Sequence, residues 1–401
     1  MSTDPSADLS QRVATMSESA TLAVSAKAKE LRAAGEDVIG FGAGEPDFPT
    51  PQHIVEAAQA ACADPALHRY SPAGGMPELK QAVVDAAAAH TGLQAEPAQV
   101  TIANGGKHAL YNVFQALLDP GDAVLIPAPY WTSYPEQVAL AGGEPIAVPT
   151  TLEQGYRVTV EQLEAARTPH TKAIVFTSPN NPTGAVHRPE EIAAIGRWAA
   201  DAGLWVIADE IYEHLVYGDV AFASLPVVAP EAAPRTVVVN GVAKTFAMTG
   251  WRVGWTIAPT ALAKAMSTMQ SHATSNVANV SQKAALAALT GPMDEVARMR
   301  ETYDRRRFLA QERLDAIDGV TCPLPEGAFY LYPSVEGLLG RSIGGRTVRT
   351  SAELCEALLE TAKVAMVPGE AFGAPGHVRV SYALDEQQML TGLDRVAQAL
   401  A

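Results

Sequence analysis

One lysine of the sequence stands just past a strongly apolar run, where its amine could act as a nucleophile. Lys244 follows Val237-Val238-Val239 and lies among the small residues Gly241 and Ala243. A lysine is usually solvated and charged, but partial burial in such surroundings lowers its pKa and suits it to Schiff-base chemistry. Arg252 follows in a segment that resumes a strand pattern and would bring a second positive charge.

An acidic pair ends another apolar run. Asp209-Glu210 follows Trp205–Ala208. A carboxylate at the tip of a buried strand costs free energy unless it is paired, so we expect a cationic partner for Asp209. The alternative is a solvated helix cap, and Tyr212 would then be incidental.

Two further polar groups are ambiguous when taken alone. In Ser178-Pro179-Asn180-Asn181-Pro182-Thr183-Gly184 the prolines restrict the backbone and could hold the amide of Asn181 in a fixed orientation, but an ordinary turn fits equally well. In the run 377–382, alternation puts Val378 and Val380 on one face. Arg379 lies on the other, as a solvent-side residue or as a clamp for a carboxylate.

The run Val100-Thr101-Ile102 leads through Asn104 and Gly105-Gly106-Lys107 into a helical pattern. Glycines at a helix start expose backbone N–H groups, and the helix dipole adds a positive potential, so the segment could cradle a phosphate. Taken alone, it fits a plain strand-to-helix turn better.

The elements that position these residues alternate between strands and helices. Nearly uninterrupted apolar runs at 124–126, 173–176, 205–208 and 237–239 are typical of strands buried on both faces of a parallel sheet. Helical patterns between them, such as 107–118, predict an α/β fold with a mainly parallel sheet flanked by helices. We expect a large domain over 50–290, and a smaller α+β domain that joins the N-terminal segment 1–49 to residues 291–401.

Composition excludes several classes of protein. The 401 residues carry 29 Lys plus Arg against 44 Asp plus Glu, a net charge of −15, which argues against a nucleic-acid partner. No signal peptide or membrane span is expected, and three cysteines outside any CxxC pair suit the cytoplasm. No metal site is expected either, because the nine histidines are scattered.

Common catalytic signatures are missing or lack their context. The sequence has no GxGxxG after a strand and no P-loop. Residues 340–344 match G-x-S-x-G by letter, but a nucleophile elbow requires a buried strand before it and a helix after it, and neither is expected here.

Taken together, the motifs closely resemble the class I aminotransferases, the fold type I family that depends on pyridoxal phosphate. The resemblance covers most of the chain in the right order, and within the family it is most similar to bacterial aspartate aminotransferases. The motifs that carry it are AGEPDFPTP, SPAGG after Tyr70, NGGK, PAPYWTSYPE, SPNNPTG, ADEIYEHLVY, NGVAKTFAMTGWRVG, PEGAFY, VPGEAFG and HVRVSYA.

The resemblance implies a role for each candidate residue, beginning with the cofactor. Lys244 would bind pyridoxal phosphate covalently and later move the substrate proton. Asp209 would keep the pyridine nitrogen protonated, and Tyr212 and Asn181 would bond the phenolic oxygen. The phosphate and the ring face would be held by Gly105, Gly106, Lys107, Arg252 and Trp131, together with Tyr70 from a second subunit of a homodimer.

For the substrate, the resemblance implies that Arg379 grips the α-carboxylate, assisted by Asn181 and the backbone at Gly44. The sequence departs from the family at two places. Gly241 stands where many members have a phosphate-binding serine, and no arginine lies between Arg252 and Arg298, where better-known aspartate enzymes supply one for the distal carboxylate.

These features predict an enzyme that transfers an amino group from an L-amino acid, with aspartate the best candidate, to 2-oxoglutarate by a ping-pong mechanism. Prephenate, alanine or aromatic amino acids are alternative substrates, and a lyase on the same scaffold is an alternative reaction. A cofactor-sensing transcription regulator is disfavoured, because only about 35 residues precede the family match and the charge is acidic. A cofactor-free aldolase would need Lys244 but not Asp209 or the phosphate residues.

Overall fold

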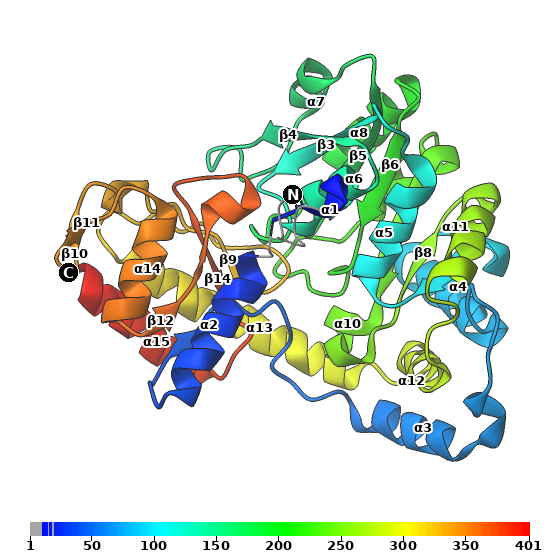
Figure 1. The fold of residues 1–401 in the computed structure, drawn as a ribbon, viewed down its shortest axis with the longest axis horizontal. Coiled ribbons are helices and arrows are strands. Elements are labelled where there is room, and N and C mark those ends of the chain that lie inside the picture. The colour runs from blue at the N-terminus through cyan, green and yellow to red at the C-terminus, as the bar shows by residue number, and fades with distance from the viewer. Residues whose placement is uncertain (1–9, 15, 18–19) are drawn as a thin grey trace, which may run out of the picture.

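The computed structural model describes residues 10–14, 16–17 and 20–401; the remaining part of the predicted segment 1–49 lies outside the described residues (Figure 1). A seven-stranded sheet forms the centre of the larger part. Its strands, in spatial order, are β2 (Val100–Ala103), β8 (Gly254–Ile257), β7 (Thr236–Gly241), β6 (Trp205–Asp209), β5 (Thr171–Thr177), β3 (Ala123–Ala128) and β4 (Glu144–Pro149).

The sheet is mainly parallel, as predicted. Strand β8 runs antiparallel to both of its neighbours, and the other six strands share one direction. Residues on both faces of β6 and β7 are buried, which explains their unbroken apolar sequence. The carboxyl ends of β2, β5, β6 and β7 therefore meet at one edge of the sheet, where ligands of such folds bind.

Helices cover this sheet on both faces (Figure 1). The helices of the larger part are α3 (Gln52–Ala63), α4 (Pro77–Thr91), α5 (Gly106–Leu117), α6 (Ser133–Leu140), α7 (Val160–Ala166), α8 (Pro189–Asp201), α9 (Leu225–Val228), α10 (Val242–Thr245), α11 (Thr260–Ala273) and α12 (Asn279–Thr290); of these, α3 packs on α12 instead of on the sheet. Helix α5 buries Leu110, Val113, Phe114 and Leu117, the apolar stripe that its 3.6-residue period predicts.

The smaller part combines both ends of the chain. Strand β1 pairs in parallel with β12 through Ile39 and Val364, which places residues 39–40 in this part. The residue boundaries of the two domains stay a prediction. Its elements are α2 (Ala20–Ala33), β1 (Ile39–Gly40), α13 (Asp294–Asp315), β9 (Tyr330–Leu331), β10 (Ser342–Ile343), β11 (Arg346–Thr347), α14 (Ser351–Thr361), β12 (Val364–Ala365), β13 (Val367–Pro368), β14 (Val378–Ser381) and α15 (Glu386–Leu400). The short helix α1 (Gln11–Ala14) instead lies beside α6 of the larger part (Figure 1).

Short 3₁₀ helices connect many of these elements. They are η2 (Pro65–His68), η3 (Pro97–Gln99), η4 (Ala233–Arg235), η5 (Thr249–Trp251), η6 (Glu336–Leu338) and η7 (Gly369–Phe372). Strand β14 lies between β13 and β9 in an antiparallel sheet. Within the described ranges, no helix has both the length and the apolar character needed to cross a bilayer.

Candidate active site

A cavity of about 590 Å³ lies between the two parts, at the carboxyl ends of the central strands. Of the residues predicted for the site, Gly105 and Tyr70 are not among those that line it. Gly105 borders Arg252, whereas Tyr70 is 90% exposed on the surface of the single chain. The predicted residues that line the cavity are Gly44, Gly106, Lys107, Trp131, Asn181, Asp209, Tyr212, Lys244, Arg252 and Arg379.

Lys244 lies on the short helix α10, directly after the buried strand β7. Its Nζ donates a hydrogen bond to the carbonyl of Gly44 and lies 5.8 Å from the ring centroid of Phe329. Burial lowers the pKa of Lys244 to about 8, and the positive charges of Arg379 and Arg252 act in the same direction. About a tenth of the amine is therefore neutral at pH 7, far more than for an ordinary lysine, and the neutral form is the one that acts as a nucleophile.

Asp209 is the last residue of β6 and is buried. Its Oδ2 accepts a hydrogen bond of 2.7 Å from the Tyr134 hydroxyl, and its Oδ1 accepts one of 3.2 Å from the backbone N–H of Ile211. Among the described residues, neutral donors hold the carboxylate and no lysine or arginine forms an ion pair with it, although the charge of Lys244 lowers its pKa. The cationic partner expected for Asp209 therefore stays a prediction. Burial raises the pKa of Asp209 to about 6. A carboxylate so placed beside a cavity fits a protonated ring nitrogen.

Gly105, Gly106 and Arg252 form a cradle for an anion at the start of α5. Gly105 has φ of 87°, and a Cβ there would lie 2.6 Å from a guanidinium nitrogen of Arg252. Arg252 itself donates to the carbonyls of Thr249 and Asn104, at 3.0 and 3.3 Å, rather than to a carboxylate. The first N–H groups of a helix lack intrahelical partners, so with Arg252 they fit a phosphate.

Close backbone packing explains why position 241 is a glycine. A Cβ on Gly241 would lie 2.9 Å from the Cα of Gly254 and 2.9 Å from the carbonyl oxygen of Val253. A Cβ on Gly254 would in turn lie 2.5 Å from the backbone nitrogen of Gly106. Strands β7 and β8 thus approach the start of α5 without intervening side chains, and a serine at position 241 would force them apart.

Arg379 is 1% exposed, so the alternative that it faces solvent is excluded. Its two terminal nitrogens donate to Oδ1 of Asn181 at 3.0 Å and to the carbonyl of Gly42 at 2.8 Å. Its guanidinium lies 4.6 Å from the ring centroid of Tyr330 and 5.0 Å from that of Phe372. A buried guanidinium held by neutral groups and aromatic rings is incompletely compensated, and it suits a carboxylate ligand.

Aromatic side chains form much of the remaining lining of the cavity. The hydroxyl groups of Tyr212 and Tyr330 lie 2.9 Å apart, and burial raises the pKa of Tyr212 well above its usual value, so it is a neutral phenol. Trp131 packs edge-to-face with Tyr134, with ring centroids 5.4 Å apart. The Nζ of Lys107 lies 5.0 Å from the Trp131 ring centroid, and burial lowers the pKa of this amine.

The sequence interpretation missed several lining residues. Tyr134 and Tyr330 occur in the motifs PAPYWTSYPE and PEGAFY, but nothing in the local pattern indicated that their hydroxyl groups support Asp209 and Tyr212. Helix α2 also contributes Ser25, Lys29 and Arg32 to the lining. It carries no recognisable motif, so only the tertiary arrangement reveals this contribution.

Comparison with known proteins gives a consistent result. The sequence profile of the family described as "Aminotransferase class I and II" matches residues 36–396. The aspartate aminotransferase of Streptomyces avermitilis is 59% identical over 393 residues, covering 98% of this chain and 96% of that protein. The aspartate/prephenate aminotransferase of Cereibacter sphaeroides is 46% identical, with 97% of each chain covered.

Solved structures agree over the same length. The aspartate aminotransferase from Rhizobium meliloti has a TM-score of 0.94 and 40% identity, with 98% of each chain covered. The aspartate aminotransferase from Thermus thermophilus with maleate has a TM-score of 0.91 and 44% identity, covering 98% of this chain and 99% of that one.

Proposed function

The chain belongs to the class I and II aminotransferases, and we propose that it uses pyridoxal phosphate to transfer the amino group of aspartate to 2-oxoglutarate in a ping-pong reaction. The observation that carries the proposal is the placement of three unlike groups around one cavity. These are the partly buried amine of Lys244, the buried carboxylate of Asp209, for which the described residues supply no ion-pair partner, and the buried guanidinium of Arg379.

The residues of the cavity fit pyridoxal phosphate at each of its polar groups. Gly105, Gly106 and Arg252 would hold the phosphate, and Asp209 would hold the pyridinium nitrogen. Tyr212 and Asn181 would donate to the phenolic oxygen, while Trp131 would cover the ring. When bound, the cofactor supplies an electron sink for the carbanion at the substrate Cα.

The chain's own residues then do the binding and the proton transfer. Arg379 takes the α-carboxylate, which fixes the orientation of the Cα–H bond relative to Lys244. Lys244 accepts the Cα proton with its neutral amine, since burial holds its pKa near 8, and its ammonium then returns that proton on the same face, the only one that a single amine can reach. Asp209 keeps its charge through the hydrogen bonds from Tyr134 and Ile211.

Lys107 is our candidate for the distal carboxylate of aspartate. The cavity is also lined by Arg379, Arg252 and Lys244, which already have roles. Helix α2 adds Lys29 and Arg32, and Arg32 donates to the carbonyl of Val38. The ammonium of Lys107 lies over the ring of Trp131, which we expect to cover the cofactor. From there it can reach the side chain of a bound substrate as well as the phosphate. This role of Lys107 would explain how the chain binds a dicarboxylate without an arginine between positions 252 and 298.

We propose a homodimer with shared sites and a cytoplasmic location. Tyr70 is 90% exposed on the single chain, which supports its expected use at the site of a second subunit. The three cysteines are free, in keeping with a reducing compartment.

An amino-donor panel with 2-oxoglutarate as acceptor tests the proposal. Aspartate should give the highest kcat/KM, and Lys107→Gln should raise the KM of aspartate about tenfold while leaving that of alanine nearly unchanged. Prephenate belongs in the panel as an acceptor, because a relative at 46% identity is an aspartate/prephenate aminotransferase. A colourless purified protein that consumes no donor would refute the proposal.

A further inference from the structure

The segment 325–330 connects two loops of the active site. The backbone N–H groups of Glu326 and Gly327 both donate to the carbonyl of Gly184, at 3.0 and 2.8 Å, in the loop that carries Asn181. The N–H of the next residue, Ala328, donates to the carbonyl of Leu215 at 2.9 Å, in the segment that follows Tyr212. The position of segment 325–330 is thus defined from both sides.

The same segment ends at a wall of the substrate site. Tyr330 contacts the Tyr212 hydroxyl with its own hydroxyl, at 2.9 Å. The face of its ring supports Arg379, with 4.6 Å from ring centroid to guanidinium carbon. A displacement of segment 325–330 would therefore reach Arg379 through Tyr330.

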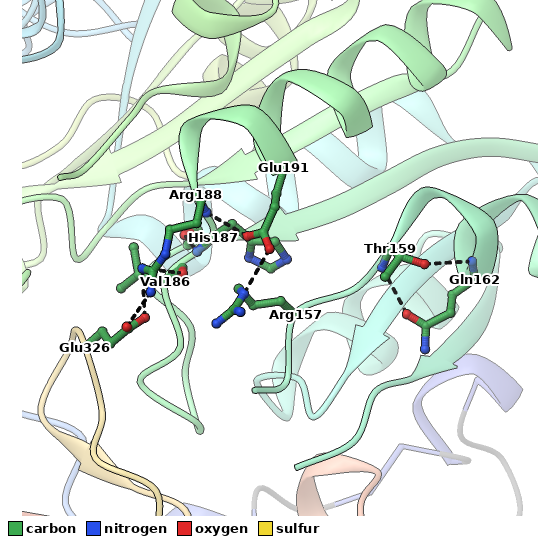
Figure 2. A network of polar contacts seen from close by, with 9 residues as sticks. Arg157, Thr159, Gln162, Val186, His187, Arg188, Glu191 and Glu326 are labelled. Atoms are coloured by element: carbon green, nitrogen blue, oxygen red, sulfur yellow. Dashed lines mark hydrogen bonds and ion pairs between the residues drawn. The ribbon is translucent and has the colours of Figure 1, made fainter. Parts of the chain in front are cut away.

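An ion pair joins Glu326, near the start of this segment, to the N-terminal end of helix α8. Arg188, the residue before the helix, makes two hydrogen bonds to the carboxylate of Glu326, at 3.0 and 2.5 Å (Figure 2). The Arg188 backbone N–H donates to Glu191 at 2.7 Å, and Glu191 also accepts from Arg157 at 3.1 Å. Arg188 is thus held from the helix side, and only about a third of either side chain of the pair is exposed.

The packing at Gly184 leaves the segment little freedom to adjust. Gly184 has φ of 69°, and a Cβ there would lie 2.5 Å from the Cβ of Pro325 and 2.8 Å from the carbonyl oxygen of Gly327. Close-packed backbones move together rather than independently. A substitution at Glu326 should therefore displace the backbone of segment 325–330 rather than only reorient one side chain.

We propose that Arg188 and Glu326 are positioning residues for the substrate carboxylate, acting through segment 325–330 on Tyr330 and Arg379. A bidentate pair has the directional rigidity for this task, and binding groups lose affinity when the residues that support them shift by a fraction of an ångström. The inference rests on the proposed function in one respect, the assignment of Arg379 to the substrate carboxylate.

The test uses the holoenzyme and the variants Glu326→Gln, Arg188→Gln and their combination. The readouts are the Kd of succinate, a non-reacting dicarboxylate, by calorimetry, the KM and kcat for aspartate, and Tm. Each single variant should raise Kd and KM about five- to tenfold with kcat within about twofold, and the double variant should match the singles. The matched control is Asp318→Asn, which removes an exposed ion pair to Arg341 of 2.7 Å and should change none of the binding values.

A lowered Tm with an unchanged Kd would overturn the inference, because the pair would then act only on stability. Effects that multiply in the double variant would also overturn it, because the two residues would then act separately. Arg379→Lys separates this inference from the proposed function. If Arg379→Lys binds succinate normally, the proposed carboxylate site is wrong; if it loses affinity while Glu326→Gln does not, only the positioning role fails.

Discussion

Arg379 donates a hydrogen bond of 3.0 Å to Oδ1 of Asn181, although 198 residues separate the two in sequence. The bond joins strand β14 of the smaller part to the loop after β5 in the larger part. The carboxylate site that we propose at Arg379 therefore depends on contacts between the two parts.

The first prediction concerns Arg379. Arg379→Ala should raise the KM of every amino-acid donor about 10- to 100-fold, since a charge-assisted fork contributes about 1.5–3 kcal/mol. Steady-state kinetics with aspartate, glutamate and alanine check this. A loss restricted to the two dicarboxylates would mean that Arg379 binds the distal group instead.

The second prediction concerns the pH dependence of Lys244. Its pKa of about 8 means that the neutral amine, the form that reacts with a carbonyl, increases tenfold per pH unit below pH 8 and reaches a plateau above it. The rate of pyridoxal phosphate uptake by cofactor-free protein, followed by visible absorbance, should show this profile. Lys244→Ala, as control, should bind the cofactor only reversibly. A rate that keeps rising tenfold per pH unit through pH 9, without a plateau, would contradict the lowered pKa.

The third prediction separates stability from catalysis at Asp209. Its carboxyl has a pKa of about 6 in the folded chain against 3.8 for an ordinary aspartate. The folded state therefore binds more protons between these values, so stability falls as pH rises through this window and the loss is complete above pH 6. Asp209→Asn should stabilise cofactor-free protein at pH 8, by up to about 3 kcal/mol, and reduce kcat about 100-fold or more.

Tyr134→Phe is the control for this prediction, because it removes one hydrogen bond to Asp209 but keeps the charge. It should reduce kcat no more than about tenfold. Urea unfolding at pH 5 and pH 8 measures the stability change. If Asp209→Asn destabilises the cofactor-free chain at pH 8, the raised pKa is wrong.

The fourth prediction concerns the packing of glycines at the sheet edge. Gly241→Ser should lower the free energy of unfolding by about 1–3 kcal/mol and weaken cofactor binding, because its Cβ would meet the backbone of Val253 and Gly254. Gly250→Ala, where a Cβ would meet nothing within 4 Å, should change stability by less than about 0.5 kcal/mol. Tighter cofactor binding by Gly241→Ser would show that the serine of other members fits here too.

Much of the fold was predictable because the central strands have both faces buried. Their apolar runs indicated a parallel sheet, and the polar residues at their ends, such as Asp209 and Lys244, indicated the edge that holds the site. The order of the strands was not predictable, since pairing between β2 and β8 depends on contacts distant in sequence.

The contacts that support the site residues were harder to predict from the sequence than the site residues themselves. Arg379 could be placed on one face of its strand, but period-2 alternation does not tell whether that face meets solvent or a second domain. Likewise, Asp209 was expected to need a cation, whereas the hydroxyl of Tyr134 reaches it from a helix 75 residues away in sequence. Such partners depend on tertiary packing, which local periodicity does not encode.

The antiparallel strand β8 has a consequence for the order in which the parts of the site are synthesised. The sheet edge at β2 is completed only when residues 254–257 have been synthesised, and the same turn delivers Arg252 to the glycines of the anion cradle. Arg379 follows more than a hundred residues later. The residues that we propose for the cofactor phosphate are therefore all synthesised before the arginine that we propose for the substrate carboxylate.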